Sequence, residues 1–247
     1  MKPPIAGSWA KLNRDESNDI IAWHPLIHHC ADVAAVTERL LMLPVLRTRL
    51  DRLGGGVGFD YIQVARLAYL AALHDAGKTN HGFQAKGAPE PDVPRAGHVQ
   101  EIIWACFSRS APNPLRVEVN RALQLQDILP WFGDDEDLLV GYLSSCFAHH
   151  GKPAHVESAD CALGTSVWVS RDGVDPLVEI RRLVAAARRW FPSAFEPTSR
   201  ALPNSQPFVH AFTGLLMLAD WIGSDNRSSA FPYSENGTSE DERMSFA

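Results

Sequence analysis

The sequence is poor in cysteine and contains no long apolar run. Its four cysteines form no CxxC pair and no zinc-finger spacing, so we interpret them as buried thiols in a reducing compartment. The first residues, Met1 to Ile5, lack the apolar core of a signal peptide. No apolar stretch is long enough to span a bilayer. These absences predict a cytoplasmic protein without a membrane partner.

The sequence also lacks an excess of basic residues. Lys and Arg number 23 against 29 Asp and Glu, a net charge of −6. No general basic surface is therefore expected, and any binding of nucleic acid has to be local or assisted by metal ions. The phosphate-binding pattern GxxxxGK[ST] is absent from these 247 residues as well. Because 45% of the residues are hydrophobic, the chain is nevertheless apolar enough to fold around a substantial core.

Helical periodicity is the main pattern in the sequence. Apolar residues recur at three- and four-residue steps, without the alternation typical of strands and without internal repeats. We predict seven or eight helices and an all-α fold, with a single domain over residues 1–226 and a polar tail or the start of a linker over 227–247. Residues 1–24 are mixed and polar, with Trp9 and Trp23 expected as anchors on the domain surface, and residues 79–97 are predicted to form a polar loop.

A His-Asp pair ends the helix that precedes this loop. His74 and Asp75 continue two apolar stripes of that helix, so both are expected on its buried side. A buried carboxylate is costly unless it is paired or bound to a metal, and an adjacent imidazole is another common metal ligand. Gly77 is predicted to end the helix in a left-handed conformation. The alternative is that the pair only caps a helix end.

Two adjacent histidines lie near the start of the helix that Pro25 opens. His29 shares a stripe with apolar residues and is expected to face inwards, whereas His28 shares the predicted solvent stripe with Asp32. Helical phase therefore favours His29 as a ligand over His28, without excluding the latter.

Further candidate ligands occupy other helix ends and faces. His98 begins a helix, and His149 and His150 end one, where a solvated pair is the alternative. Asp220 interrupts the most apolar helix, in which an acid has to meet a cation. His81, in the loop, is expected to be a surface residue, as is His155.

Together these candidates exceed what one metal ion needs. Five imidazoles and two carboxylates suit two ions that share a bridging carboxylate, an arrangement that acts on the attacking and leaving oxygens of a phosphoester. An imidazole-rich shell favours manganese, iron, cobalt, nickel or zinc over magnesium. The predicted ligands are His29, His74, Asp75, His98, His149, His150 and Asp220.

The order of these residues along the chain resembles the HD superfamily of metal phosphohydrolases. Finer motifs resemble one branch of it, the HD nuclease of the CRISPR type I interference nuclease-helicase, from Trp9 to Tyr233. The motifs are WHPLIHHCADVAAV at 23–36, HDAGK at 74–78, FQ at 83–84, GH at 97–98 and ADWIGSD at 219–225.

The resemblance implies a DNA-cleaving site with two transition metal ions. One ion would be held by His29, His74, Asp75 and Asp220, and the other by Asp75, His98, His149 and His150, with Asp75 as the bridge. The resemblance also implies that Lys78 lies near the scissile phosphate and that Ser224 supports the site. Implied partners are a superfamily 2 helicase, in cis or in trans, and a CRISPR RNA-guided surveillance complex.

Single-stranded DNA is the expected substrate form. A flexible strand reaches two metal ions more easily than a stiff duplex does, and the chain shows neither a helicase motif nor a broad basic surface. Two other functions are alternatives. One is an HD phosphohydrolase of nucleotides or cyclic dinucleotides, for which no base-reading motif is present. The other is a metal-free helical interaction module whose histidines are structural.

Overall fold

The computed structural model describes residues 7–151, 156, 159–197, 200–225 and 240–244. Within these residues the fold is all-α, as predicted, apart from one small β-hairpin. The elements of nine residues or more are α1 (Leu26–Met42), α2 (Pro44–Leu53), α3 (Tyr61–Ala72), α5 (Val99–Phe107), α6 (Asn113–Ala122), α8 (Glu136–Phe147), α9 (Pro176–Trp190) and α10 (Gln206–Gly223). The short ones are β1 (Trp9–Arg14), β2 (Ile20–Pro25), η1 (Ala76–Thr79), α4 (His81–Gln84), η2 (Ala85–Gly87), α7 (Leu125–Ile128), η3 (Leu129–Phe132), η5 (Gly164–Val167), η6 (Pro192–Phe195) and α11 (Glu240–Arg243).

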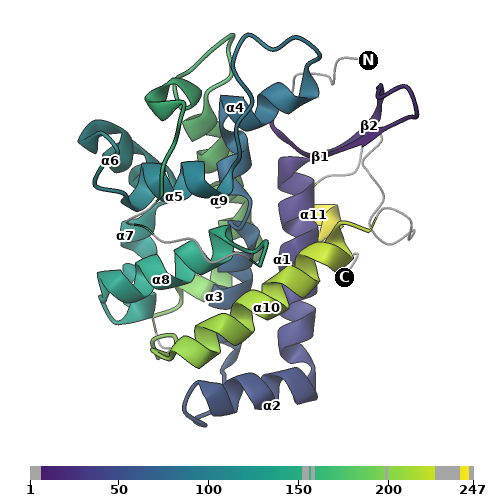
Figure 1. The fold of residues 1–247 in the computed structure, drawn as a ribbon. Coiled ribbons are helices and arrows are strands. Elements are labelled where there is room, and N and C mark those ends of the chain that lie inside the picture. Colours follow the sequence, from purple (N-terminus) through teal and green to yellow (C-terminus); the bar gives the residue numbers. More distant parts are fainter. Residues whose placement is uncertain (1–6, 152–155, 157–158, 198–199, 226–239, 245–247) are drawn as a thin grey trace.

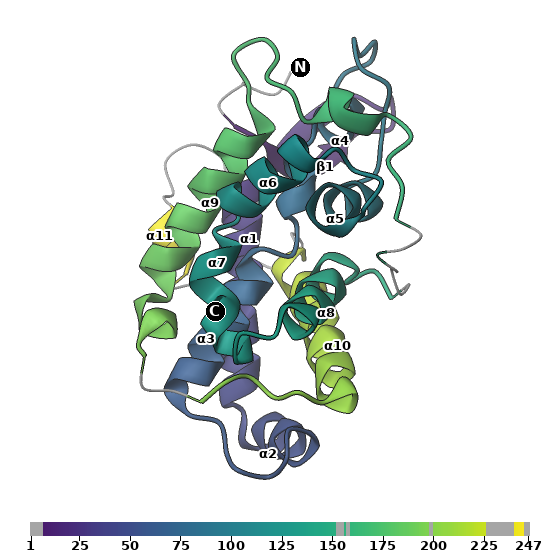
Figure 2. The same ribbon diagram turned by 90° about the vertical axis from the view of Figure 1, so that its left-hand side faces the viewer.

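Helices α1 and α3 form the centre of the molecule. They pack against each other, with α8 and α10 on one side and α9 and α11 on the other (Figure 2). Helix α3 begins with a capping box, in which Asp60 and Gln63 satisfy each other's backbone amides. All its residues from Ile62 to Ala72 are buried, which is typical of a helix surrounded by others. The end of α3 therefore lies in the interior of the fold.

The N-terminal segment contains two strands that the sequence does not indicate. Trp9 to Pro25 form an antiparallel hairpin, seen beside the N-terminal end of α1 in Figure 1. Its strand pairing shifts register twice, between Trp9 and Lys11 and between Asn13 and Arg14. Each shift interrupts the two-residue alternation by which a strand is recognised in a sequence. Trp9 is also buried, not a surface anchor.

The segment 79–97 is more ordered than the predicted loop. The short helices α4 and η2 occupy its first part, and the Asn80 side chain caps α4 by accepting from the amide of Phe83. Both are a single turn or less, too short for periodicity to reveal.

The described part of the predicted tail, residues 240–244, lies against α1. The Arg243 guanidinium binds both oxygens of Asp32, at 2.8 and 2.6 Å. Both side chains are 0% exposed, so the expected solvent position of Asp32 on α1 is wrong. A third group, His24 Nε2, lies 3.2 Å from the same carboxylate. Sequence periodicity classes Asp32 as a polar residue. It cannot show that Arg243, 211 residues further along the chain, places a cation next to it.

No helix in the described ranges is both long and apolar enough to cross a lipid bilayer.

Candidate metal centre

The turn after α3 carries the first two candidate ligands. Helix α3 ends at Ala72, and Asp75 is the residue that precedes η1. His74 is fixed within this turn because its Nδ1 donates to the carbonyl of Ala71 at 2.8 Å. The imidazole and the carboxylate are both 0% exposed, so the turn presents both groups to the protein interior, as helical phase predicts.

Gly77 is required here for a different reason from the predicted one. It does not belong to the glycines with positive φ. A Cβ built on Gly77 would lie 2.1 Å from the carbonyl oxygen of His98, so any side chain would collide with backbone. The glycine thus lets η1 approach the start of α5, which brings His98 beside Asp75.

One oxygen of Asp75 faces a cluster contributed by α1, the turn after α3, and α10. Asp75 Oδ2 lies 3.1 Å from His29 Nε2 and 3.3 Å from His74 Nε2. Asp220 reaches the same cluster, with Oδ1 at 3.2 Å from His29 Nε2. One ligand atom each from His29, His74 and Asp75 lie within 4.8 Å of one another. His28, the neighbour that phase disfavours, is only half-buried.

The other oxygen of Asp75 faces a second cluster. Asp75 Oδ1 lies 3.3 Å from His98 Nε2 and 3.6 Å from His149 Nε2. His150 joins this group through His98, with 3.1 Å between their Nε2 atoms. His149 is buried, whereas His150 is exposed and His98 half-buried. The second cluster therefore lies nearer to the surface than the first, and Asp75 stands between the two.

The donor set fits divalent metal ions. Three inward nitrogens (His29 Nε2, His74 Nε2 and His149 Nε2) and Asp75 Oδ1 are buried without a hydrogen-bond partner among the described residues, and Asp75 Oδ2 has an ion pair with Lys78. In His149, as in His74, Nδ1 donates to a backbone carbonyl, that of Cys146 at 2.9 Å. A neutral imidazole held in this way presents a lone pair at Nε2, the form in which histidine binds metals. Unpaired buried polar atoms are otherwise rare and costly.

The pKa values of Asp75, Asp220 and His149 give the protonation states that metal binding requires. Burial raises the pKa of Asp75, but Lys78, His74 and His29 outweigh it and hold this pKa well below its usual value. Burial also raises the pKa of Asp220, but the contact with His29 outweighs burial, so this pKa is lowered as well. Burial lowers the pKa of His149 to about 3. At neutral pH these groups are charged carboxylates and a neutral imidazole, as metal ligands have to be.

In the described part of the chain, three polar side chains support the two carboxylates. Lys78 is 3% exposed, and its Nζ lies 2.5 Å from Asp75 Oδ2. Ser224 Oγ donates to Asp220 Oδ1 at 3.0 Å. Lys11, which the sequence does not single out, places Nζ 3.4 Å from the same oxygen of Asp220. No motif marked Lys11, because it comes from a strand that the sequence does not reveal.

The remaining histidines that the sequence singled out lie elsewhere. His81 is half-buried, and its pKa is lowered chiefly by burial, with the backbone of Val169 and the side chains of Arg171 and Asp172 nearby. His155 lies outside the described residues.

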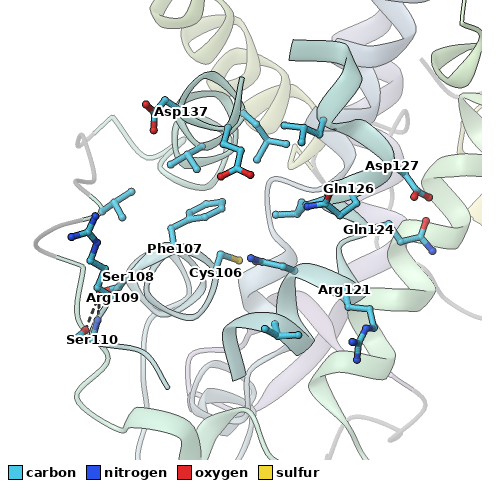
Figure 3. Close-up of a pocket in the computed structure, with 18 residues that line it drawn as sticks. Cys106, Phe107, Ser108, Arg109, Ser110, Arg121, Gln124, Gln126, Asp127 and Asp137 are labelled. Atoms are coloured by element: carbon cyan, nitrogen blue, oxygen red, sulfur yellow. Dashed lines mark hydrogen bonds between the residues drawn. The ribbon is translucent and has the colours of Figure 1, made fainter. Parts of the chain in front are cut away.

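A cleft of about 1290 Å³ between α5, α6, α7 and α8 is separate from the metal centre. None of its lining residues is a predicted ligand. Figure 3 shows side chains of both charges around it, among them Arg109, Arg121, Asp127 and Asp137. Opposed charges provide no uniform positive potential for a phosphate backbone, so this cleft does not compete with the metal centre as a nuclease site.

Comparisons with known proteins point to one family. A family model described as the HD domain of Cas3 matches residues 9–228. The CRISPR-associated endonuclease/helicase Cas3 of Thermus thermophilus is 30% identical over 225 residues, which is 85% of this chain and 22% of that protein. The chain therefore spans less than a quarter of the length of this relative.

Solved structures share the fold. The Thermus thermophilus Cas3 HD domain, crystallised in the presence of Ni²⁺, matches with a TM-score of 0.55 and 24% identity over 90% of this chain and 81% of that one. A chain from a structure titled "CRISPR RNA-guided surveillance complex, pre-nicking" matches with a TM-score of 0.57 and 19% identity over 99% of this chain and 28% of that one. At these identities the likeness concerns the fold alone.

Proposed function

Because the chain belongs to the HD-domain family of Cas3, the CRISPR-associated HD nucleases, we propose that it is a metal-dependent nuclease that cuts single-stranded DNA during CRISPR interference. The observation that carries this proposal is the position of Asp75. Each of its two oxygens faces one of two histidine clusters, at 3.1 to 3.6 Å from the nearest imidazole nitrogens. A buried carboxylate placed in this way is suited to bridging two ions.

The proposed ligand sets follow the two clusters. His29, His74 and Asp220 would hold one ion and His98, His149 and His150 the other, with Asp75 shared between them. Two divalent ions would supply an activated water nucleophile and charge for the leaving oxygen.

The chain's own residues would orient these groups. Backbone carbonyls fix His74 and His149 through Nδ1, and Ser224 holds Asp220. Lys78 would keep Asp75 ionised and, from its buried position beside that carboxylate, add positive charge to the site that the scissile phosphate enters.

The donor chemistry favours a transition metal ion over magnesium. Magnesium prefers an octahedral shell of oxygens and retains several waters, whereas five of the seven proposed ligands are imidazoles. Imidazole suits manganese, iron, cobalt, nickel and zinc. The use of Ni²⁺ with the Thermus thermophilus domain supports the same choice among these ions, of which we propose manganese, iron, cobalt or nickel.

The proposed substrate form and partners follow from charge and from the relatives. With a net charge of −6, the chain has little means of holding a stiff duplex, whereas a flexible single strand can reach a partly exposed metal centre. The Thermus thermophilus relative is named as an endonuclease and helicase. We therefore propose a superfamily 2 helicase as partner, in cis or in trans, and the RNA-guided surveillance complex as the assembly that supplies the strand.

A side-by-side time course on one sequence in two forms tests the proposal. Manganese, cobalt or nickel is supplied to the purified protein with a single-stranded oligonucleotide, its blunt duplex or a cyclic dinucleotide. We expect cutting of the single strand, much slower cutting of the duplex, and loss of activity with a chelator. Equal rates on both DNA forms without ATP contradict the substrate form, and turnover of the dinucleotide alone indicates a nucleotide phosphohydrolase instead.

Metal content is measured on the same preparation. We expect two ions per chain by elemental analysis after saturation. A titration that stops at one ion contradicts the two-metal mechanism, and a protein that binds no metal supports a helical interaction module.

A further inference from the structure

Among the described residues, two lysines approach the metal centre, and they differ in exposure. The Lys78 ammonium contacts Asp75 and its side chain is 4% exposed, whereas the Lys11 ammonium contacts Asp220 and its side chain is 26% exposed. Lys78 therefore lies within the protein and Lys11 at the rim of the site. Of these two cations, only Lys11 is open to an approaching anion without a rearrangement of the core.

The position of Lys11 is built into the fold. Gln84 on α4 accepts from the backbone amide of Trp9 at 3.1 Å and donates to the carbonyls of Trp9 at 3.0 Å and of Lys78 at 2.6 Å. Lys78 Nζ lies in turn 3.4 Å from the carbonyl of Ala10. One glutamine thus joins strand β1 to the turn that carries Asp75, so the backbone of Lys11 is held at a fixed place relative to the metal centre.

The contact between Lys11 and Asp220 is weak enough for Lys11 to bind a second anion. Asp220 Oδ1 already accepts from Ser224 Oγ at 3.0 Å and lies 3.2 Å from His29 Nε2, while Lys11 Nζ is farther away, at 3.4 Å. A partly exposed ion pair of this length contributes little stability. Metal ions bound at the carboxylate would weaken its attraction for the lysine, and a four-carbon stem lets the ammonium move to another anion.

We propose that Lys11 binds a backbone phosphate of the DNA strand at the rim of the metal centre, next to the phosphate that is cut; this rests on the proposed nuclease function. Lys78 then acts on Asp75 from inside, and Lys11 acts on the strand from outside. The hairpin, which contributes no metal ligand among the predicted set, thereby gains a function: it presents one cation to a substrate that the net negative charge of the protein would otherwise repel.

The test compares three variants, two of which lose one positive charge and one of which keeps it. Lys11→Met removes the ammonium and keeps the apolar stem, Lys11→Arg keeps the charge, and Arg49→Met removes one exposed cation from α2, at the far end of α1 from the hairpin (Figure 1). The measurements are metal content, affinity for a short thymidine oligonucleotide with a phosphorothioate backbone over a salt series, and cutting of the natural oligonucleotide.

We expect Lys11→Met to bind the oligonucleotide roughly 3- to 10-fold more weakly and to reduce the slope of log affinity against log salt by about 0.7, the value for one phosphate contact on a single strand. Its metal content should stay at the wild-type value, Lys11→Arg should retain the slope, and Arg49→Met should match the wild type.

Two results overturn the inference. Either Lys11→Met binds DNA as Arg49→Met does, or it loses metal, which shows that Lys11 positions Asp220 instead. Failure of the proposed function is recognised separately, because a wild-type protein that binds metal and oligonucleotide but does not cut it contradicts the nuclease while leaving the contribution of Lys11 to binding measurable.

Discussion

Replacement of Arg243 by leucine should destabilise the protein strongly, although this residue lies in a stretch that the sequence describes as a polar tail. The guanidinium and the Asp32 carboxylate are both 0% exposed and joined by two hydrogen bonds. Removal of one partner of such a pair leaves a buried charge without compensation, which costs about 3–5 kcal/mol. We expect a loss of this size in the free energy of unfolding of the metal-free protein.

The loss should depend on pH through His24. Burial lowers the pKa of His24 to about 4, with Asp32 raising it and His29 and Arg243 lowering it. In the folded wild type this histidine stays neutral. Its contribution to the free energy of unfolding is therefore complete above the unfolded pKa of about 6.5, and it falls by on the order of 3 kcal/mol as the pH drops towards 4. Without Arg243 the folded pKa of His24 rises, and protonated His24 can pair with Asp32. The difference between variant and wild type should therefore shrink from about pH 8 to about pH 5.5.

Urea unfolding followed by circular dichroism at these pH values measures both effects. Arg181→Leu, at an exposed position on α9, is the control for loss of one arginine. The double variant Asp32→Asn with Arg243→Leu should recover much of the stability, because it removes the isolated charge. A cost below about 1 kcal/mol for Arg243→Leu, comparable to a surface ion pair, would refute the reasoning and show that α11 does not dock on α1 in solution.

Three further predictions concern the metal centre. Asp75→Ala should abolish cutting and weaken both metal sites, because the two oxygens of Asp75 face both clusters. His81→Ala should stay near the wild type in metal content and turnover. An inactive His81→Ala variant would contradict the ligand assignment. Lys78→Ala should retain metal but lose about 10²-fold in turnover, as expected for the removal of a charge that stabilises the transition state, and loss of metal in this variant would assign Lys78 to site assembly. Gly77→Ala should unfold at a clearly lower urea concentration and bind metal more weakly, because the added Cβ would lie 2.1 Å from the His98 carbonyl oxygen. The control Gly141→Ala, with nothing within 4 Å of the added Cβ, should gain about 0.5–1 kcal/mol in the free energy of unfolding, as glycine replacements inside helices do. Equal effects of the two substitutions would show that the approach of η1 to α5 is not tight.

Local sequence information was sufficient for the longer helices and for the inward position of His29, His74 and Asp75. The three- to four-residue recurrence of apolar side chains records which face of a helix is buried, so it placed His74 and Asp75 inwards and preferred His29 over His28 without knowledge of the partner helices. Residue chemistry then nominated these imidazoles and carboxylates as metal ligands, because a buried carboxylate has to meet a cation. The assignment of these residues to two ions, and the domain boundary near residue 226, stay predictions.

Tertiary structure decided what depends on distant partners. Asp32 belongs to a polar stripe of α1 by sequence, yet it is buried because Arg243 returns to neutralise it. Gly77 resembles a helix stop, yet its lack of a side chain serves the close approach of α5. Lys11 has no pattern around it, and only the pairing of β1 with β2 and the bridge through Gln84 bring it to Asp220. Periodicity reports whether a position is buried; which charged group meets another across the fold is set by packing between elements far apart in the chain.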